Sequence, residues 1–390
     1  MTMTGAMHSH SSDGRRKGIH LLIYPSPLLG PGRIGKIGRS LQAADHFDET
    51  IIVGIHSGDV DAVQEVGPKV RIERIRGASI RQFLGGFRIM ALWPIRVYRR
   101  YRRADLAAVA AQNVYVLPLA YHLAKKADAV LAYNAHELET ETIGAGGLKK
   151  KVAKFIERRY IRHADVVSVV NESIAQWYAE AYPGLAPVVL TNTPIDDGNS
   201  VDLRRQLSIP DGELLYIHVG FLTAGRSIPL LLQAFASRPG IHLAFLGDGA
   251  LRPLVSEAMR SSPNIHLLPT VAPDEVVSVV RGADVGLCVI EYVSLSDRLS
   301  TPNKLMEAWV AGIPPLSSDL IEARRLLGPV LSRTWVLEDP ERDLGPALDR
   351  IGEKEIAEFA EHWHRIPSWD EQVVDLVTAY AEALERRRLP

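Results

Sequence analysis

The sequence predicts an α/β protein made of two Rossmann-like domains, and three observations lead to this fold class. Short buried-strand patterns alternate with helical stretches along most of the chain, as in parallel sheets covered by helices. This alternation pauses in a polar, turn-rich segment at residues 191–198 and then begins again. The length of 390 residues also suits two domains of ordinary size better than one large core.

Four segments follow from this pattern. Residues 1–17 are polar and have no apolar stretch of signal-peptide length, which predicts a disordered tail. Residues 18–194 are expected to form the first domain and residues 195–364 the second. Residues 365–390 predict a C-terminal helix, because Ser368–Glu371 has the pattern of a capping box and an apolar helical stripe follows it.

The first domain begins with a predicted strand at Ile19–Tyr24, a glycine-rich turn and a helix, which is typical of a Rossmann opening. The glycine spacing is not the dinucleotide-binding fingerprint, and no acidic residue closes the next strand, Thr50–Ile55. A cofactor-binding dehydrogenase is therefore disfavoured. We interpret Gly30, Pro31 and Gly32 as a loop that faces the cleft between the domains.

The net charge of −1 conceals a difference between the two halves. Through Leu190 there are 26 Lys and Arg against 17 Asp and Glu, a net of +9, and the remainder has 19 against 29, a net of −10. A basic first half indicates contact with an anionic surface or substrate, although charge alone does not say which.

One basic segment leaves two interpretations open. Phe87–Arg103 alternates large apolar residues with arginines. The stretch Arg88–Arg103 could lie on an anionic membrane surface, or it could be an amphipathic helix that covers the sheet and keeps its arginines in water. Nucleic acid is disfavoured as a partner, because no recognition motif accompanies the charge.

Several other classes are disfavoured by single features. Cys288 is the one cysteine, which excludes an internal disulfide, and its apolar surroundings predict a core strand. Cysteine and histidine spacing suggests no zinc site, and Asp59 and Asp61 are expected to be solvated turn carboxylates. The apolar region Leu106–Ala124 is interrupted by polar residues, which favours a strand followed by a helix over a membrane span.

The second domain restarts with a predicted strand at Leu214–Val219 and a helix at Ile228–Ser237. Ser227 is expected to be the N-cap of that helix. Arg226 stands just before the cap, where its guanidinium and the free helix N–H groups could hold an anion together.

The most informative stretch is Ser300–Pro314, which predicts a short helix. Thr301 is expected to be its N-cap, Pro302 its first residue, and Gly312 its end.

Lys304 falls in the first turn of this helix, where the helix dipole disfavours a cation by roughly 0.3–1 kcal/mol. We therefore expect an anion such as a phosphate at this helix start. Glu307 lies one turn deeper on the same face, where its carboxylate could accept hydrogen bonds from a ribose diol. The alternative is an exposed Lys304–Glu307 pair on an ordinary helix.

The run Ser-Thr-Pro-Asn-Lys-Leu-Met-Glu-Ala-Trp-Val-Ala-Gly-Ile-Pro-Pro-Leu-Ser-Ser-Asp at 300–319 resembles the donor-nucleotide motif of GT-B glycosyltransferases. It is similar to the family 4-like enzymes with a PNK-x-x-E-x-x-x-x-G-x-P segment, here Pro302, Asn303, Lys304 and Glu307. The resemblance covers the chain from about Gly18 onward. It implies two Rossmann-like domains facing a cleft and a C-terminal helix that crosses back to the first domain. It also implies a nucleotide diphosphate sugar as co-substrate, no cofactor and no catalytic metal.

The resemblance extends to Asn134–Leu138, where the family has a D-A-H-E-L segment. Asn134 replaces the acid, and the other four residues match. By this resemblance His136 would contact the donor sugar or stabilise charge near the reacting carbon, and Glu137 would orient His136 or the acceptor. His136 could instead only satisfy backbone groups of its loop.

Donor contacts are expected in two further places. Arg226 matches the position where the resembling enzymes hold a donor phosphate with Arg or Lys. The loop beginning with Gly220 and Phe221 and the turn Gly247-Asp248-Gly249 are expected to line the same site, because glycines allow a base or phosphate to approach the backbone closely.

One position departs from the family pattern. Many family 4 enzymes have another Glu eight residues before the motif glutamate, and Leu299 stands there in this chain. Asp297, Arg298 or loop N–H groups are the expected substitutes for contacts to the transferred sugar.

The expected function is hexosyl transfer from a UDP- or GDP-sugar to a hydroxyl acceptor, glycan or lipid-linked, with retention of configuration. Arg226 and Lys304 would neutralise the diphosphate leaving group. We expect a cytoplasmic enzyme, at the inner face of the membrane if Arg88–Arg103 binds lipid. A nucleotide-sugar epimerase or hydrolase, and a non-catalytic partner subunit, are the alternatives.

Overall fold

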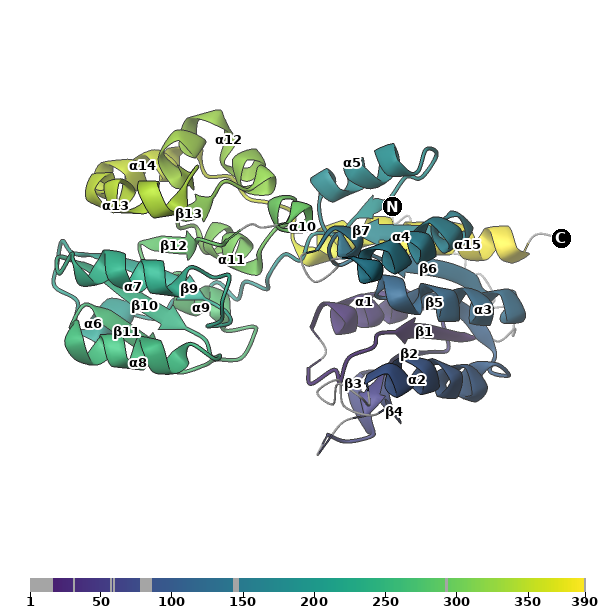
Figure 1. Cartoon of the computed structure of the whole chain (residues 1–390). Coiled ribbons are helices and arrows are strands. Elements are labelled where there is room, and N and C mark those ends of the chain that lie inside the picture. The colour runs from purple at the N-terminus through teal and green to yellow at the C-terminus, as the bar shows by residue number, and fades with distance from the viewer. Residues whose placement is uncertain are drawn as a thin grey trace, which may run out of the picture. The chain divides into compact units, whose positions relative to one another are not determined.

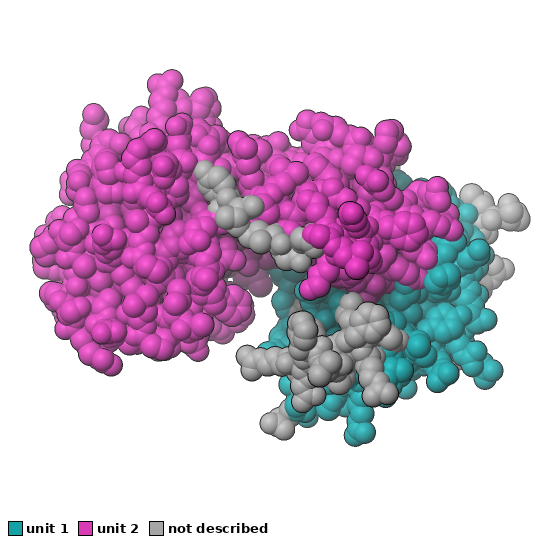
Figure 2. Space-filling view, viewed as in Figure 1, with its two compact units in different colours: residues 1–111, 119–131, 381–390 teal, residues 112–118, 132–380 magenta. Residues whose placement is uncertain are grey.

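The structure is a computed structural model that describes residues 17–30, 32–56, 58, 60–77, 86–142, 147–291 and 294–388. The chain forms two compact units (Figure 2). Unit 1 consists of residues 1–111, 119–131 and 381–390, and unit 2 of residues 112–118 and 132–380. Two sheets, one mostly and one wholly parallel, are covered by helices and confirm the predicted α/β class (Figure 1).

The first sheet has eight strands in the order β3-β4-β2-β1-β5-β6-β7-β8. β3 pairs antiparallel with β4, whereas β1 is parallel to both β2 and β5. Chain order therefore reverses direction at β1, as in a doubly wound sheet. The strands are β1 (Ile19–Ile23), β2 (Glu49–His56), β3 (Val63–Gly67), β4 (Val70–Arg76), β5 (Leu106–Ala111), β6 (Val130–Asn134), β7 (Val166–Val169) and β8 (Val188–Val189).

Five α-helices accompany this sheet in the described residues: α1 (Gly32–Ala43), α2 (Gly86–Tyr101), α3 (Leu117–Ala127), α4 (Leu148–Tyr160) and α5 (Glu172–Ala181). α2 contains the predicted basic segment. Among the side chains described from residue 92 onward, Trp93, Val97 and Tyr101 are buried, at the spacing of one helical face. This burial favours the interpretation of α2 as a helix that covers the sheet, although Leu92 and Ile95 stay exposed.

The second sheet has six strands in the order β11-β10-β9-β12-β13-β14, and every pairing in it is parallel. This is the strand order 3-2-1-4-5-6 of a Rossmann fold, so its topological switch point lies between β9 and β12. The strands are β9 (Leu214–Val219), β10 (Ile241–Leu246), β11 (Ile265–Leu268), β12 (Val285–Cys288), β13 (Pro315–Ser318) and β14 (Val336–Leu337). Cys288 is fully buried in β12, as predicted.

Strand residues alternate between two apolar cores, one on each face of the second sheet. One core includes residues of α7 (Ile228–Ala236), α8 (Arg252–Ser261), α12 (Ile321–Trp335), α13 (Pro340–Arg350) and α14 (Glu353–His362). The other includes residues of α6 (Leu203–Leu207), α9 (Val276–Val280) and α11 (Asn303–Ala311). α11 lies close to β12 because Gly286 has no side chain: a Cβ there would be 2.5 Å from the Cβ of Ala308.

The last helix, α15 (Trp369–Arg388), begins in unit 2 and ends in unit 1. The predicted capping box is present, since the Ser368 N–H donates to Glu371 and the Glu371 N–H donates back to the Ser368 hydroxyl at 3.3 Å. The Thr191 N–H donates to Gln372 at 3.0 Å. Near its end, Arg387 pairs with Asp128 at 3.0 Å. The helix thus returns to residues of the first half of the chain.

Candidate functional site

The motif helix α11 begins one residue later than predicted. Pro302 has extended backbone angles and is the N-cap position, without a side-chain capping bond, so Thr301 is not the N-cap. The predicted end is correct, because Gly312 adopts a left-handed conformation with φ 79°. Between these ends, Lys304 lies in the first turn and Glu307 three residues on.

Lys304 is partly buried, and its Nζ lies 3.3 Å from Nε2 of His218. Burial is the main cause that lowers the pKa of Lys304 from its ordinary 10.5 to about 8, and the charge of Arg226 contributes to the same lowering. The two cations predicted from separate helix starts are therefore close enough in the structure to destabilise each other.

His218 stands at the carboxyl end of β9 and is fully buried. Burial, then the charges of Lys304 and Arg226, hold its pKa well below the ordinary 6.5, so the ring is neutral. Its Nδ1 has no hydrogen-bond partner in the described part of the chain. Sequence reasoning missed this residue, although a histidine in the otherwise apolar strand Leu214–Val219 is the kind of signal that marks a strand end facing a ligand.

Glu307 is partly buried beside Lys304. Burial raises the pKa of its carboxyl from the ordinary 4.5 to about 7, and the opposing effect of the Lys304 charge is smaller. A buried carboxylate without a strong partner is costly, which is a common property of side chains kept for a ligand.

These groups converge on the switch point of the second sheet. Lys304, Arg226 and Glu307 all act electrostatically on Cys288, whose thiol pKa is raised chiefly by burial. The N–H of Glu291 donates to the Gly225 carbonyl at 3.1 Å, which holds the loop after β9 against the segment after β12. Ligands of open α/β sheets bind at this position, beyond the carboxyl ends of the strands.

The predicted glycines of the site have a structural role in holding two loops together. A Cβ at Gly247 would lie 1.9 Å from the Gly220 carbonyl oxygen, and one at Gly249 would lie 2.5 Å from the Leu222 carbonyl oxygen. The neighbouring Asp248 pairs loosely with Arg252 at 4.0 Å, and Phe221 is exposed. The glycines thus allow the loops after β9 and β10 to pack against each other; their contact with a donor stays a prediction.

In unit 2, the loop after β6 also carries predicted site residues. Nε2 of His136 lies 2.9 Å from the Gln112 side-chain oxygen, so this nitrogen donates its proton to Gln112. Glu137 keeps an exposed surface, and incomplete hydration, followed by the charge of Asp297, raises the pKa of its carboxyl above the ordinary value. Asp297 comes from α10 (Leu295–Arg298), directly before the motif, so the two segments named by the resemblance are near each other.

Asn171 is a second residue that sequence reasoning missed. Its side-chain oxygen accepts from the Ile174 N–H at 2.8 Å and caps α5. Its amide donates to the Leu299 carbonyl at 2.7 Å and to the Thr301 hydroxyl at 2.9 Å. Asn171 therefore ties α5 to the segment that leads into α11. The Thr301 hydroxyl accepts a hydrogen bond from Asn171 instead of capping α11.

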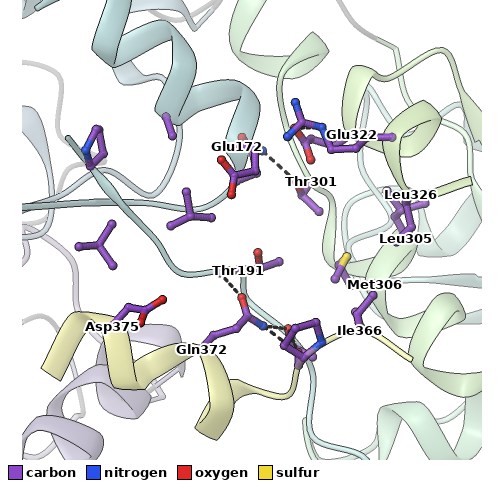
Figure 3. Close-up of a pocket in the computed structure, with 18 of the residues that line it drawn as sticks. Glu172, Thr191, Thr301, Leu305, Met306, Glu322, Leu326, Ile366, Gln372 and Asp375 are labelled. Atoms are coloured by element: carbon purple, nitrogen blue, oxygen red, sulfur yellow. Dashed lines mark hydrogen bonds and ion pairs between the residues drawn. The ribbon is translucent and has the colours of Figure 1, made fainter. Parts of the chain in front are cut away.

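A cavity of about 770 Å³ lies beside this connection (Figure 3). Thr301, Leu305 and Met306 line it from the motif side, and Gln372 with Thr191 lines another side. In the same region the Ser173 N–H donates to the Glu322 carboxylate at 3.0 Å, and the Ser173 hydroxyl also donates to it. The Ser173 bonds hold the start of α5 to α12, and the Asn171 bonds hold it to the motif segment.

Other predicted residues are less informative. Gly30 lies between β1 and α1 in unit 1, Gly32 is the first residue of α1, and Pro31 and Asp59 lie outside the described residues. Asn303 accepts from the Asn192 amide at 3.1 Å. The described residues contain no group of three or more His, Cys, Asp or Glu placed to hold a metal ion. No helix within the described ranges has the length and apolar character that a membrane span requires.

The two doubly wound sheets, the returning helix α15 and the similarity to solved structures define the class: the chain has the GT-B fold. Residues 32–192 match the family described as Glycosyl transferase 4-like domain. The resemblance to family 4-like GT-B glycosyltransferases is thereby confirmed. Comparison with curated proteins gives no match.

Solved structures of similar fold cover nearly the whole chain. A sucrose-phosphate synthase from Thermosynechococcus elongatus is 16% identical with a TM-score of 0.72, covering 95% of this chain and 100% of that chain. HepE of Anabaena in complex with UDP-glucose is 16% identical with a TM-score of 0.64, at the same coverage. The lipopolysaccharide outer core galactosyltransferase WaaB is 14% identical with a TM-score of 0.61, covering 93% of this chain and 99% of that chain. At identities this low, the structural similarity establishes the shared fold and nothing more specific.

Proposed function

We propose that the protein is a glycosyltransferase that moves a hexosyl group from a nucleotide diphosphate sugar to a hydroxyl acceptor with retention of configuration. The observation that carries the proposal is the convergence of Arg226 and Lys304 on neutral His218 at the switch point of the second sheet. Two cations held near each other in a partly buried site are stabilised by an anion between them, and a diphosphate supplies one.

In the proposed reaction, the bond between the anomeric carbon and the β-phosphate oxygen breaks. A bond between that carbon and the acceptor oxygen forms, and the hydroxyl proton passes to the departing phosphate. Arg226 and Lys304 stabilise the negative charge that grows on the leaving diphosphate, a task that a metal performs in other enzymes. They are already in place before the reaction, so little reorganisation is needed.

In this proposal the ionised Glu307 carboxylate accepts hydrogen bonds from the ribose hydroxyls. His136 and Glu137 lie beside the transferred sugar. The position of Asp297 close to Glu137 supports a role for the segment before the motif in sugar contacts, where Leu299 replaces the family acid. Binding of the ribose would offset part of the cost of keeping Glu307 ionised.

For the partner molecules, we infer a UDP- or GDP-sugar and a glycan or lipid-linked acceptor. HepE, in complex with UDP-glucose, and WaaB, a lipopolysaccharide outer core galactosyltransferase, support these classes by their shared fold. Peripheral membrane contact through Arg88–Arg103 remains part of the proposal, with Leu92 and Ile95 as the exposed apolar residues of α2.

The test begins with thermal shifts of the full chain in UDP-, GDP-, ADP- and dTDP-sugars, which identify the donor. Purified protein is then incubated with that donor, with and without candidate acceptors, and free nucleotide is measured. Nucleotide release that depends on the acceptor is expected. Conversion of donor without acceptor would identify an epimerase or hydrolase instead. Binding without either reaction for any acceptor would indicate a non-catalytic subunit.

A further inference from the structure

Helix α4 exposes its apolar residues and buries a charged one. Leu148, Val152 and Phe155 are 77%, 43% and 68% exposed, at the i, i+4 and i+7 spacing of a single helical face. The opposite side buries Glu157 completely. An ordinary surface helix has the reverse arrangement, so the outward face requires a reason.

The orientation of α4 is fixed by the buried carboxylate. Glu157 accepts hydrogen bonds from the hydroxyls of Tyr178 at 2.6 Å, Tyr182 at 2.8 Å and Tyr133 at 3.1 Å. Turning the helix to bury Phe155 would remove a carboxylate from three donors, which is strongly unfavourable. The apolar stripe therefore stays on the outside in the folded protein.

The same outward face is strongly basic. The exposed residues of 148–163 include no acid, and Glu141 neutralises only Lys150 and Lys154, which are partly buried. A shallow groove of about 410 Å³ lies on this face beside Phe155. Its remaining lining residues are all cations: Lys151, Lys154, Arg158, Arg159 and Arg162.

We propose that the outward face of α4 docks on an anionic lipid bilayer, with Leu148, Val152 and Phe155 entering the interface and the surrounding cations binding lipid phosphates. Apolar residues at the centre and cations around them match the chemistry of a membrane surface. A second copy of the chain fits less well, because two such faces would bring cations together. Nucleic acid would leave the apolar stripe unused. The inference does not depend on the proposed glycosyl transfer, and it concerns a helix other than α2.

The experiment is cosedimentation of the full chain with vesicles of phosphatidylcholine alone and of phosphatidylcholine mixed with phosphatidylglycerol. We expect binding to the mixed vesicles only, weakening as salt is added. The variant K151Q/R158Q/R162Q should bind about a hundredfold less tightly, from roughly fivefold for each cation removed. The variant L148S/F155S should lose at least about tenfold, because the apolar anchors are gone.

A matched variant on α8, L254S/M259S, removes two exposed apolar residues outside both basic helices and should bind like the wild type. Because all of these residues are exposed, thermal unfolding and nucleotide affinity should be unchanged in every variant and show that each has folded. Binding by the α4 variants equal to that of the wild type, loss of binding in the α8 variant alone, or no binding of the wild type to mixed vesicles would overturn the proposal. So would a wild-type dimer that dissociates in L148S/F155S, because the face would then be a contact between copies.

Discussion

Replacing Lys304 by methionine is expected to change how the free energy of unfolding depends on pH. A lysine that gains an anionic partner on folding loses stability as the pH rises, whereas the buried Lys304 should make the wild type more stable as the pH rises. In the folded protein burial and Arg226 lower the pKa of Lys304 from 10.5 to about 8. Below the folded value the chain must keep a disfavoured cation in place, and this cost is fully present. As the pH rises from about 8 to 10.5 the folded state releases the proton first, and the cost disappears.

The size of the effect follows from the shift. A change from 10.5 to about 8 corresponds to roughly 3.5 kcal/mol at most, at about 1.4 kcal/mol per pKa unit. Methionine has a similar length and no charge, so K304M lacks this titration. Loss of the Lys304–His218 hydrogen bond costs about 1 kcal/mol and partly offsets the gain near pH 7. The free energy of unfolding of K304M relative to wild type should therefore fall by about 2–3 kcal/mol between about pH 7 and pH 10.

The assay is urea unfolding of wild type and K304M at both pH values, followed by tryptophan fluorescence. The same experiment on K126M, a change at an exposed lysine in the last turn of α3, is the control and should show no such difference. A constant difference between K304M and wild type over this range would refute the reasoning, as would a difference that grows with pH. Saturating nucleoside diphosphate should remove the effect in the wild type, since a bound anion restores a high pKa to Lys304.

Three further predictions concern residues around this site. At Glu307, burial raises the pKa of the carboxyl from 4.5 to about 7. The free energy of unfolding of E307Q, measured in urea, should therefore gain up to about 3 kcal/mol over that of the wild type as the pH rises from about 4.5 to 8. No such gain would contradict the argument from burial. At Asn171, N171D keeps the cap of α5 but loses the donor to Leu299, so hydrogen exchange at residues 299–303 should speed up about 5- to 150-fold while α5 stays protected. Exchange that speeds up equally in both segments would show that Asn171 serves only the cap. In the closely packed β12–α11 contact, G286A should cost about 1–3 kcal/mol of unfolding free energy and weaken nucleotide binding, and adding A308G should recover part of both; an unaffected G286A would mean that α11 can move freely.

The sequence was sufficient for most of the second sheet and for the motif helix. β9 has the predicted bounds, because it is a short apolar run bounded by turn residues. Gly312 ends α11 as predicted, since its left-handed conformation is a local property of the chain. The hairpin of β3 and β4 was not anticipated, because Val63–Gly67 is polar and mostly accessible and gives no strand pattern.

The parts of the site that were missed depend on contacts between distant residues. His218 lies 86 positions from Lys304, and nothing in its own strand identifies its partner. Asn171 contacts Leu299 and Thr301 from 128 and 130 positions away. That contact also explains why the predicted N-cap of α11 was wrong. The Thr301 hydroxyl accepts a hydrogen bond from Asn171, and Pro302 occupies the N-cap position. Capping signals are local, and a tertiary hydrogen bond can replace them.

Arg226 and Lys304, in contrast, were predicted from the sequence although they lie far apart in it. They stand 78 positions apart, yet both were predicted, because a helix N-terminus with a nearby cation is a local signal for an anion and the family resemblance indicates the same two positions. Parallel α/β topology then brings the starts of helices that follow neighbouring strands to one edge of the sheet.

The most direct test of the central claim, that Arg226 and Lys304 bind one diphosphate together, is a double-mutant cycle read by calorimetric titration. R226M, K304M and the double variant are titrated with the nucleoside diphosphate of the identified donor and with the corresponding nucleoside. Each single change should weaken diphosphate binding about 10- to 150-fold, the two losses should differ from additivity by at least about 0.5 kcal/mol, and nucleoside binding should be unchanged. Additive losses, or equal losses for the nucleoside, would contradict the claim.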